Sequence, residues 1–161
     1  MTVSLVTNNF LEATFQQHSA LPIIYIMLIW FQSSRFNPES VFLLTDYISY
    51  RLLILMGIFL ELGHLIEFGI LYLLIILAFL TYRGLTLKIE ITAMVTAIIY
   101  GVIDEIHQQF TPFRSFSMID ILKDMIGVIV IWWIVRKAYD KKNPSKFGKL
   151  LKKVGHMSNR T

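Results

Sequence analysis

A long apolar stretch constrains the fold of this chain more than any other feature. Between Leu52 and Tyr82 the only charged residues are Glu61 and Glu67. Such a run exceeds the roughly 20 residues that cross the hydrocarbon core of a bilayer as a helix. The whole chain is 55% hydrophobic and 16% charged, whereas a soluble domain carries roughly 25% charged residues. These values exclude an ordinary soluble globule and indicate a membrane protein.

The apolar stretch is longer than one upright span requires. As a helix it would measure about 46 Å at 1.5 Å per residue, against about 30 Å for the hydrocarbon core. We expect the span to occupy 61–82 and an interfacial lead-in to occupy 50–60. The helix therefore tilts, protrudes from the bilayer, or breaks near Gly57 or Gly63.

Three further segments have the composition of membrane spans. They are 20–34, 89–109 and 118–136, of which the first has the shortest apolar run. In 89–109 the polar residues lie in the last half, and in 118–136 they lie in the first half. Together with 61–82, these segments predict an all-α fold, a polytopic membrane helix bundle of about four transmembrane helices.

Charge is distributed unevenly along the chain. Nine of the fifteen Lys and Arg residues lie from Arg136 onward, where the only acid is Asp140. Residues 1–135 carry six basic and ten acidic residues, so the net charge of +4 comes from the tail. We therefore divide the chain into a transmembrane domain over 1–137 and a basic tail over 138–161. A basic tail on an acidic membrane body does not indicate binding to nucleic acid.

The basic tail also predicts the orientation of the bundle. Cytoplasmic connections are enriched in Lys and Arg, and four spans place the tail on the same side as the loop 83–88. We expect cytoplasmic N- and C-termini and a multi-pass protein of the cell membrane. Within the tail, apolar residues recur at helical spacing at Phe147, Leu150, Leu151 and Val154. This segment is either a basic amphipathic helix on anionic lipids of the inner leaflet or a solvated tail.

The polar exceptions to the apolar pattern gather at one depth in the predicted bundle. Ionisable residues are rare inside spans and usually face the bundle interior or a water-filled cavity. If the tail is cytoplasmic, the ionisable residues of three spans lie in the half of each span nearest the outer surface. The loop between the last two spans adds an arginine, which can act as their counter-charge. We expect an outward-facing pocket. Its candidate residues are His64, Glu67, Asp104, Glu105, His107, Gln108, Arg114, Asp120 and Asp124.

Helical spacing aligns several of these residues on common faces. Asp104, His107 and Gln108 share one face of the third span, and Asp120 and Asp124 share one face of the fourth. Glycines about one turn away on the same faces would allow the helices to approach closely. The halves of the spans nearest the tail are apolar, which argues against a transport path.

Several chemistries are compatible with such a pocket. His64 with Glu67, and Asp104 with His107, are i, i+3 pairs of metal-ligand types, but this spacing is only permissive and we expect no metal or cofactor. An acid with a histidine also suits general acid–base work on a lipid-linked or cell-surface substrate. Noncatalytic recognition of a polar head group is a third interpretation. In a fourth, the protein is a structural membrane subunit whose polar residues only hold helices together.

Three motifs resemble those of the VanZ-like family of small bacterial membrane proteins. The sequence YGVIDEIHQQFTPFRSFSMIDILKDMIG at 100–127 resembles the family's DEIHQ-type run, its loop with Pro and Arg-Ser, and its D-x-x-x-D helix. The sequence GHLIEFG at 63–69 resembles the family's H-x-x-E-[YF] run. The sequence WFQSS at 30–34 resembles the Ser-Ser that closes the family's first span. One departure is Glu61, at a position where the family often has a basic residue.

The resemblance implies a protein of the cytoplasmic membrane with about four spans. The family takes its name from a protein linked to resistance to teicoplanin, a glycopeptide that acts on cell-wall precursors outside the membrane. The resemblance therefore implies reduced sensitivity to lipoglycopeptides through a component of the cell envelope, and it supplies no reaction. The expected partners are the lipid bilayer and a cell-wall precursor or lipid head group at the outer leaflet.

Overall fold

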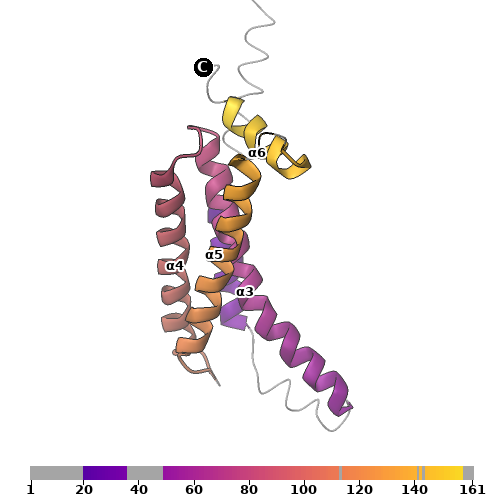
Figure 1. Ribbon diagram of the computed structural model, residues 1–161. Helices are drawn as coiled ribbons and strands as arrows, with labels where there is room; N and C mark the ends of the chain where they lie inside the picture. The colour runs from indigo at the N-terminus through magenta and orange to yellow at the C-terminus, as the bar shows by residue number, and fades with distance from the viewer. Residues whose placement is uncertain (1–19, 36–48, 113, 141, 143, 158–161) are drawn as a thin grey trace, which may run out of the picture.

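The computed structural model describes residues 20–35 and 49–157, apart from 113, 141 and 143. These residues form helices and short connections, so the predicted all-α class is confirmed for the described part of the chain. The predicted cytoplasmic N-terminus falls in residues 1–19, outside the described residues. The helices are the segment 20–35, α3 (Tyr50–Leu80), α4 (Leu87–Gln108), α5 (Met118–Asp140) and α6 (Lys146–Met157) (Figure 1).

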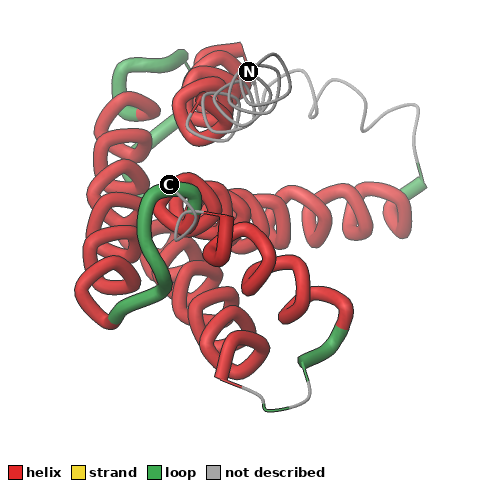
Figure 2. The backbone as a smooth tube through the Cα atoms, turned by 90° about the horizontal axis from the view of Figure 1, so that it is seen from above, coloured by secondary structure: helices red, strands yellow, loops and turns green. Residues whose placement is uncertain are grey.

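α3 is one unbroken helix, and neither Gly57 nor Gly63 interrupts it. It ends before Thr81, whose hydroxyl donates a hydrogen bond to a carbonyl of the preceding turn over 2.6 Å. The first part of α3 extends away from the other helices, as Figures 1 and 2 show from two directions. Phe59 in this part is 81% exposed. The expected break is therefore absent, and the expected lead-in and span belong to the same helix.

α3 and α5 pack closely where two glycines meet. A Cβ atom added to Gly127 would collide with the backbone of Leu65, and one added to Gly69 would lie 2.7 Å from the Ile131 side chain. Helix backbones approach this closely only where small residues remove the side chains between them. The close approach expected at Gly127 is therefore present. The buried apolar core beside it includes Phe68, Leu71, Tyr72, Ile76, Val128 and Val135.

α4 turns small and polar side chains inward and apolar side chains outward. A helix on the surface of a water-soluble protein has the opposite pattern, because its polar residues face the solvent. An extended apolar outer surface is typical of a protein that contacts a membrane or a partner. The buried residues of α4 are Glu90, Ala93, Ala97, Gly101, Asp104, Glu105 and Gln108. Its exposed side carries Ile91, Val95, Ile99, Ile103 and Ile106.

The helical segment 20–35 packs against α4 through specific side-chain contacts. The Tyr100 hydroxyl donates a hydrogen bond to the carbonyl of Ile26 over 2.8 Å. Nearer the end of α4, the ring of Trp30 stacks on the ring of His107, with centroids 3.7 Å apart. The expected first span is therefore a helix that the side chains of α4 hold in place.

The tail forms a helix that packs on the bundle. α6 contacts α3 and α5 near the end of α3 and the beginning of α4 (Figure 1). Leu151 is buried, and Phe147 and Val154 pack against the core, whereas Leu150 stays exposed. The expected amphipathic helix is present, but protein contacts cover most of its apolar side. The contact of this helix with lipids of the inner leaflet stays a prediction.

The most apolar part of the described chain is the second half of α3. Leu62–Leu80 is the one helical stretch among the described residues that is long and apolar enough to cross a membrane by length and composition. It packs against α4, α5 and α6. The number of four spans and the orientation of the bundle stay predictions.

Candidate functional site

A cavity of about 390 Å³ lies near the end of the bundle opposite α6, where α4 ends and α5 begins. Residues of the segment 20–35 and of α3 complete its wall. Most of its lining residues have polar side chains, although the bundle around it is rich in apolar side chains. The lining residues are Ile29, Gln32, Ser33, Phe59, Gly63, His64, Glu67, Asp104, Gln108, Arg114 and Asp120.

Most of the residues singled out in the sequence lie at this cavity. Glu105 and Asp124 do not line it, but both lie close to His64, which does. His107 points elsewhere, toward the segment 20–35. These residues belong to three helices and one loop, so only tertiary packing brings them together. The lining members of the predicted set are His64, Glu67, Asp104, Gln108, Arg114 and Asp120.

The buried carboxylates of α4 are only partly hydrogen bonded. Gln108 Nε2 donates to Asp104 Oδ2 over 2.6 Å. The backbone N–H of Ser117 donates to Glu105 Oε2 over 3.0 Å, which ties the loop before α5 to α4. The other oxygens, Asp104 Oδ1 and Glu105 Oε1, are buried and have no hydrogen-bond partner among the described residues. Nearly all buried polar atoms in proteins are hydrogen bonded, so these two oxygens are exceptions and candidate acceptors for a ligand.

His64 connects α3 to α5 beside the cavity. Its Nδ1 atom lies 3.7 Å from Asp124 Oδ1, and Asp124 is 2% exposed. Gly101 leaves room for this carboxylate, because a Cβ atom there would lie 3.1 Å from Asp124 Oδ2. Within the described segments, neither oxygen of Asp124 receives a hydrogen bond. An imidazole beside a buried carboxylate suits both proton transfer and metal binding.

Two cations lie among these carboxylates. Lys123 Nζ lies 2.7 Å from Asp120 Oδ1, which is three residues earlier on α5. Arg114 lines the cavity, and its Nη1 donates to the carbonyl of Ser33 over 3.4 Å. Arg114 therefore links the loop before α5 to the segment 20–35 and brings positive charge to the cavity.

The expected placement of His107 has to be corrected. Its spacing puts it on the same face of α4 as Asp104 and Gln108, but the ring stacks on Trp30. The Nε2 atom of His107 also lies 2.8 Å from the hydroxyl oxygen of Ser34. Residues at i, i+3 and i+4 lie on one face of a helix but point in somewhat different directions. His107 therefore contacts a different neighbour from Asp104 and Gln108. It joins the segment 20–35 to α4 and does not line the cavity.

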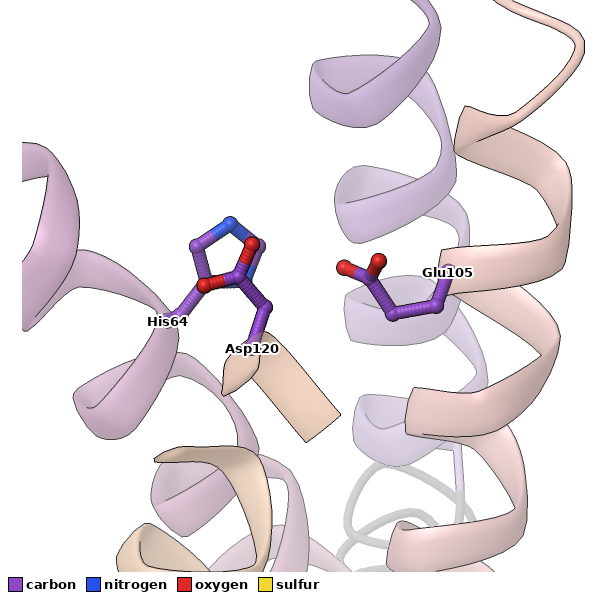
Figure 3. A group of neighbouring side chains, drawn as sticks. All are labelled: His64, Glu105 and Asp120. Carbon is purple, nitrogen blue, oxygen red and sulfur yellow. The ribbon is translucent and has the colours of Figure 1, made fainter. Parts of the chain in front are cut away.

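Three donor atoms from three helices approach one another beside the cavity. One nitrogen of His64 and one carboxylate oxygen each of Glu105 and Asp120 lie within 4.8 Å of one another. Figure 3 shows the Glu105 carboxylate facing the His64 ring and Asp120. The group differs from the i, i+3 pairs on single helices that the sequence suggests as metal ligands.

A second cavity adjoins the polar one. Its volume is about 330 Å³, and it lies between the segment 20–35 and α3. Gln32, Phe59, Gly63 and Glu67 line both cavities, so the two spaces are neighbours. The rest of the second lining is mostly apolar and consists of Tyr25, Leu62, Ile66 and Ile70. A space lined mainly by polar residues therefore adjoins a groove lined mainly by apolar residues.

A buried acid near the start of α4 is missing from the set predicted from the sequence. Glu90 is 0% exposed and accepts hydrogen bonds from two residues of α5. Trp132 Nε1 donates to it over 2.8 Å and Arg136 Nη1 over 2.6 Å. The expectation that the half of each span nearest the tail is apolar is therefore wrong at Glu90. The signal in the sequence is the helical spacing of Glu90 with the small residues on the buried face of α4.

Comparison with known proteins places the chain in a family. The chain matches no curated protein and no solved structure. The sequence model of the family described as VanZ/LLP1 matches residues 2–139, a stretch that contains every candidate pocket residue. This match covers most of the chain and confirms the resemblance carried by the motifs. The chain therefore belongs to the VanZ/LLP1 family.

Proposed function

We propose that the protein is a multi-pass bacterial membrane protein whose outward-facing pocket binds the polar head of a cell-envelope amphiphile. This binding lowers the sensitivity of the cell to teicoplanin and related lipoglycopeptides. The observation that carries the proposal is the pair of adjoining cavities, one lined mainly by polar residues and the other mainly by apolar residues. Membership of the VanZ/LLP1 family supports the general context.

The outer surface of the helices supports a position in the membrane. Large apolar side chains are exposed on every long described helix, which is unfavourable in water and favourable in lipid. The segment 20–35, α3, α4 and α5 then form the four spans, and the basic residues from Arg136 onward orient α6 toward the cytoplasm. The polar cavity, at the other end, faces outward. Examples of the exposed side chains are Ile23, Met27, Ile66, Ile99, Ile119, Ile126 and Val130.

An amphiphile suits the two cavities because its two parts need different surroundings. The head would lie in the polar cavity beside His64 and Glu67, and the apolar chain would follow the groove along Ile66 and Ile70. Both isoleucines are exposed on the outer surface of α3. The ligand would therefore enter sideways from the bilayer without leaving it.

The polar cavity favours a head group rich in hydrogen-bond donors. Ionised carboxylates only accept hydrogen bonds, and Asp104 Oδ1 is buried with no partner in the described structure. Hydroxyl and amide groups of a sugar–peptide head would donate to such oxygens. Arg114 and Gln32 supply donors for the carbonyl oxygens of the same head. This chemistry supports a cell-wall precursor as the ligand.

Gly63 provides the test, because it lines both cavities and a Cβ atom there meets no other atom within 4 Å. We expect the native protein, expressed in a sensitive Gram-positive host, to raise the inhibitory concentration of teicoplanin several-fold. Gly63→Leu fills the junction of the cavities and abolishes this effect. Gly63→Ala adds one methyl group and preserves it. Immunoblots of membranes establish equal protein levels, and equal resistance with Gly63→Leu would contradict the proposal.

A second candidate function is acid–base catalysis on a lipid-linked substrate, favoured by the contact of His64 with Asp124. His64 rather than His107 suits this role, because the ring of His107 is stacked on Trp30. His64→Gln keeps a hydrogen-bonding side chain but cannot relay a proton. Catalysis predicts that this variant loses resistance while native amounts of envelope lipid still co-purify, as measured by mass spectrometry. Simple binding predicts that resistance and co-purification change together.

The lysines of α6 are the part of the tail that remains available for lipid. Lys146, Lys149 and Lys153 are exposed, and we propose that they lie against anionic lipids of the inner leaflet. Replacing all three by Gln should weaken binding of the purified protein to anionic nanodiscs over zwitterionic ones, with the largest difference at low salt. An unchanged preference for anionic lipid would contradict this contact.

A further inference from the structure

We propose that His64, Glu105 and Asp120 bind one divalent transition-metal cation beside the polar cavity. Their donor atoms lie within 4.8 Å of one another. Two of the three residues also line the head-group pocket, but the metal site does not depend on the proposed ligand of that pocket, because metal binding can be measured without any envelope ligand. Zinc and manganese are the ions whose ligand preferences suit one imidazole and two carboxylates.

The geometry allows the three side chains to close around an ion. Ligand atoms of zinc lie about 2.0–2.2 Å from the metal, so each side chain would move inward by less than about 1 Å. His64 and Asp120 line the polar cavity, which gives an ion a path to the site. The His64 and Asp120 side chains are 19% and 24% exposed, so both keep some freedom to adjust.

The buried carboxylate of Glu105 points to a missing positive partner. Glu105 is 1% exposed, and only its Oε2 atom receives a hydrogen bond, from the backbone of Ser117. Its Oε1 atom is without a partner in the part of the chain that the structure describes. Figure 3 shows this carboxylate aimed at His64 and Asp120. Burying an ionised carboxylate is costly unless it is paired or binds a metal, and a cation between the three residues would satisfy it.

Asp124 extends the site behind His64. A histidine that binds a metal usually donates its other ring N–H to a carboxylate, which fixes the ring. Asp124 Oδ1 lies 3.7 Å from His64 Nδ1, and neither Asp124 oxygen has a described hydrogen-bond partner. On the other side, Lys123 Nζ lies 2.7 Å from Asp120 Oδ1, so a cation at this group would share the Asp120 carboxylate with Lys123.

The charges around the group favour a cation. The acids near the cavity outnumber the two basic side chains described there, and charges interact strongly where water is scarce. A divalent cation would offset the excess of negative charge around the polar cavity. The acids are Glu67, Asp104, Glu105, Asp120 and Asp124, and the basic residues are Arg114 and Lys123.

Metal titration of the purified full-length protein in detergent tests the site. After treatment with a chelator, we expect calorimetry and elemental mass spectrometry to give one Zn²⁺ or Mn²⁺ per chain. His64→Ala and Glu105→Gln should each weaken the affinity at least tenfold. As controls, His107→Ala removes a histidine and Asp140→Asn converts a carboxylate to an amide outside the group. Both variants should keep the native affinity.

A spectroscopic measurement on the native protein needs no variant that has to fold. Co²⁺ should bind one to a chain with visible d–d bands, and one equivalent of Zn²⁺ should remove them. Failure of the native protein to bind any of these ions in stoichiometric amount would overturn the proposal, as would native affinity in folded Glu105→Gln. The teicoplanin test with Gly63→Leu stands apart from this result, so failure of the metal site and failure of the pocket are distinguishable.

Discussion

His64 on α3 and Asp124 on α5 face each other at 3.7 Å, between Nδ1 and Oδ1, just beside the polar cavity. Asp124 lies three residues from Gly127, where the backbone of α3 closely approaches α5. Gly101 of α4 leaves the space that the Asp124 carboxylate occupies. One histidine–carboxylate pair therefore depends on the packing of three helices, and it joins the structural core to the candidate site.

Asp124→Asn should raise stability while reducing function. Asp124 is buried, its oxygens receive no hydrogen bond from the described residues, and the contact with His64 at 3.7 Å offsets only part of the desolvation cost, so removing the charge relieves the rest. We expect the free energy of unfolding in detergent to rise by about 1–3 kcal/mol. The measurement is chemical unfolding followed by tryptophan fluorescence. Asp140→Asn, at an exposed site, should change it by less than about 0.5 kcal/mol. A lower stability of Asp124→Asn would show that the carboxylate is well compensated.

Gly127→Ala and Gly63→Ala should have opposite effects on stability. A Cβ atom at Gly127 collides with the backbone of Leu65 and forces α3 and α5 apart, whereas Gly63 has open space. Overpacking should cost about 1–3 kcal/mol at Gly127, and better helix propensity should add about 0.5–1 kcal/mol at Gly63. Thermal unfolding in detergent compares the two variants. Similar transition temperatures would argue against a close crossing of α3 and α5.

The two acidic partners of Arg136 should contribute unequally. Glu90 is buried and binds both Arg136 and Trp132, whereas Asp140 pairs with Arg136 at the exposed end of α5. Glu90→Gln should cost about 1.5–3 kcal/mol of unfolding free energy, because it weakens hydrogen bonds to a buried charged group. Asp140→Asn should cost less than about 0.5 kcal/mol, as is usual for exposed ion pairs. Equal costs would contradict the difference in burial.

Neighbouring leucines of α6 report whether the helix packs on the bundle. Leu151 is buried in the core, and Leu150 is exposed. Leu151→Ala should lower the free energy of unfolding by about 2–4 kcal/mol, because replacing a buried leucine by alanine leaves a cavity in the core. Leu150→Ala should change it by less than about 0.5 kcal/mol. If neither variant unfolds more easily than the native protein, α6 does not pack on the bundle in solution.

The proposed orientation is testable because the chain has no cysteine. Ser115 in the loop before α5 and Ser145 before α6 are both exposed. In intact cells, Ser115→Cys should react with a membrane-impermeant maleimide, and Ser145→Cys should react only after the cells are opened. The mass shift on a gel gives the result. Labelling of Ser145→Cys from outside would reverse the proposed topology and the outward direction of the pocket.

Much of the fold was predictable because hydropathy and helical spacing are local properties of the chain. The apolar stretches predict helices close to the observed α4 and α5, and the motif residues His64, Glu67, Asp104, Gln108, Arg114 and Asp120 are distinguishable as polar exceptions. The family itself follows from the same motifs. The buried Glu90 escapes this reasoning, because its partners Trp132 and Arg136 lie on another helix.

The sequence by itself determined the all-α class, the unequal distribution of charge and the set of polar residues from which a site is built. Only the tertiary structure decided how these residues pair, because pairing depends on the rotation of each helix and on its neighbours. That rotation turns His107 onto Trp30 and brings Glu105 to His64 and Asp120. Packing likewise covers the apolar side of α6. A helical wheel shows which residues share a face, but contact between faces is a property of the folded bundle.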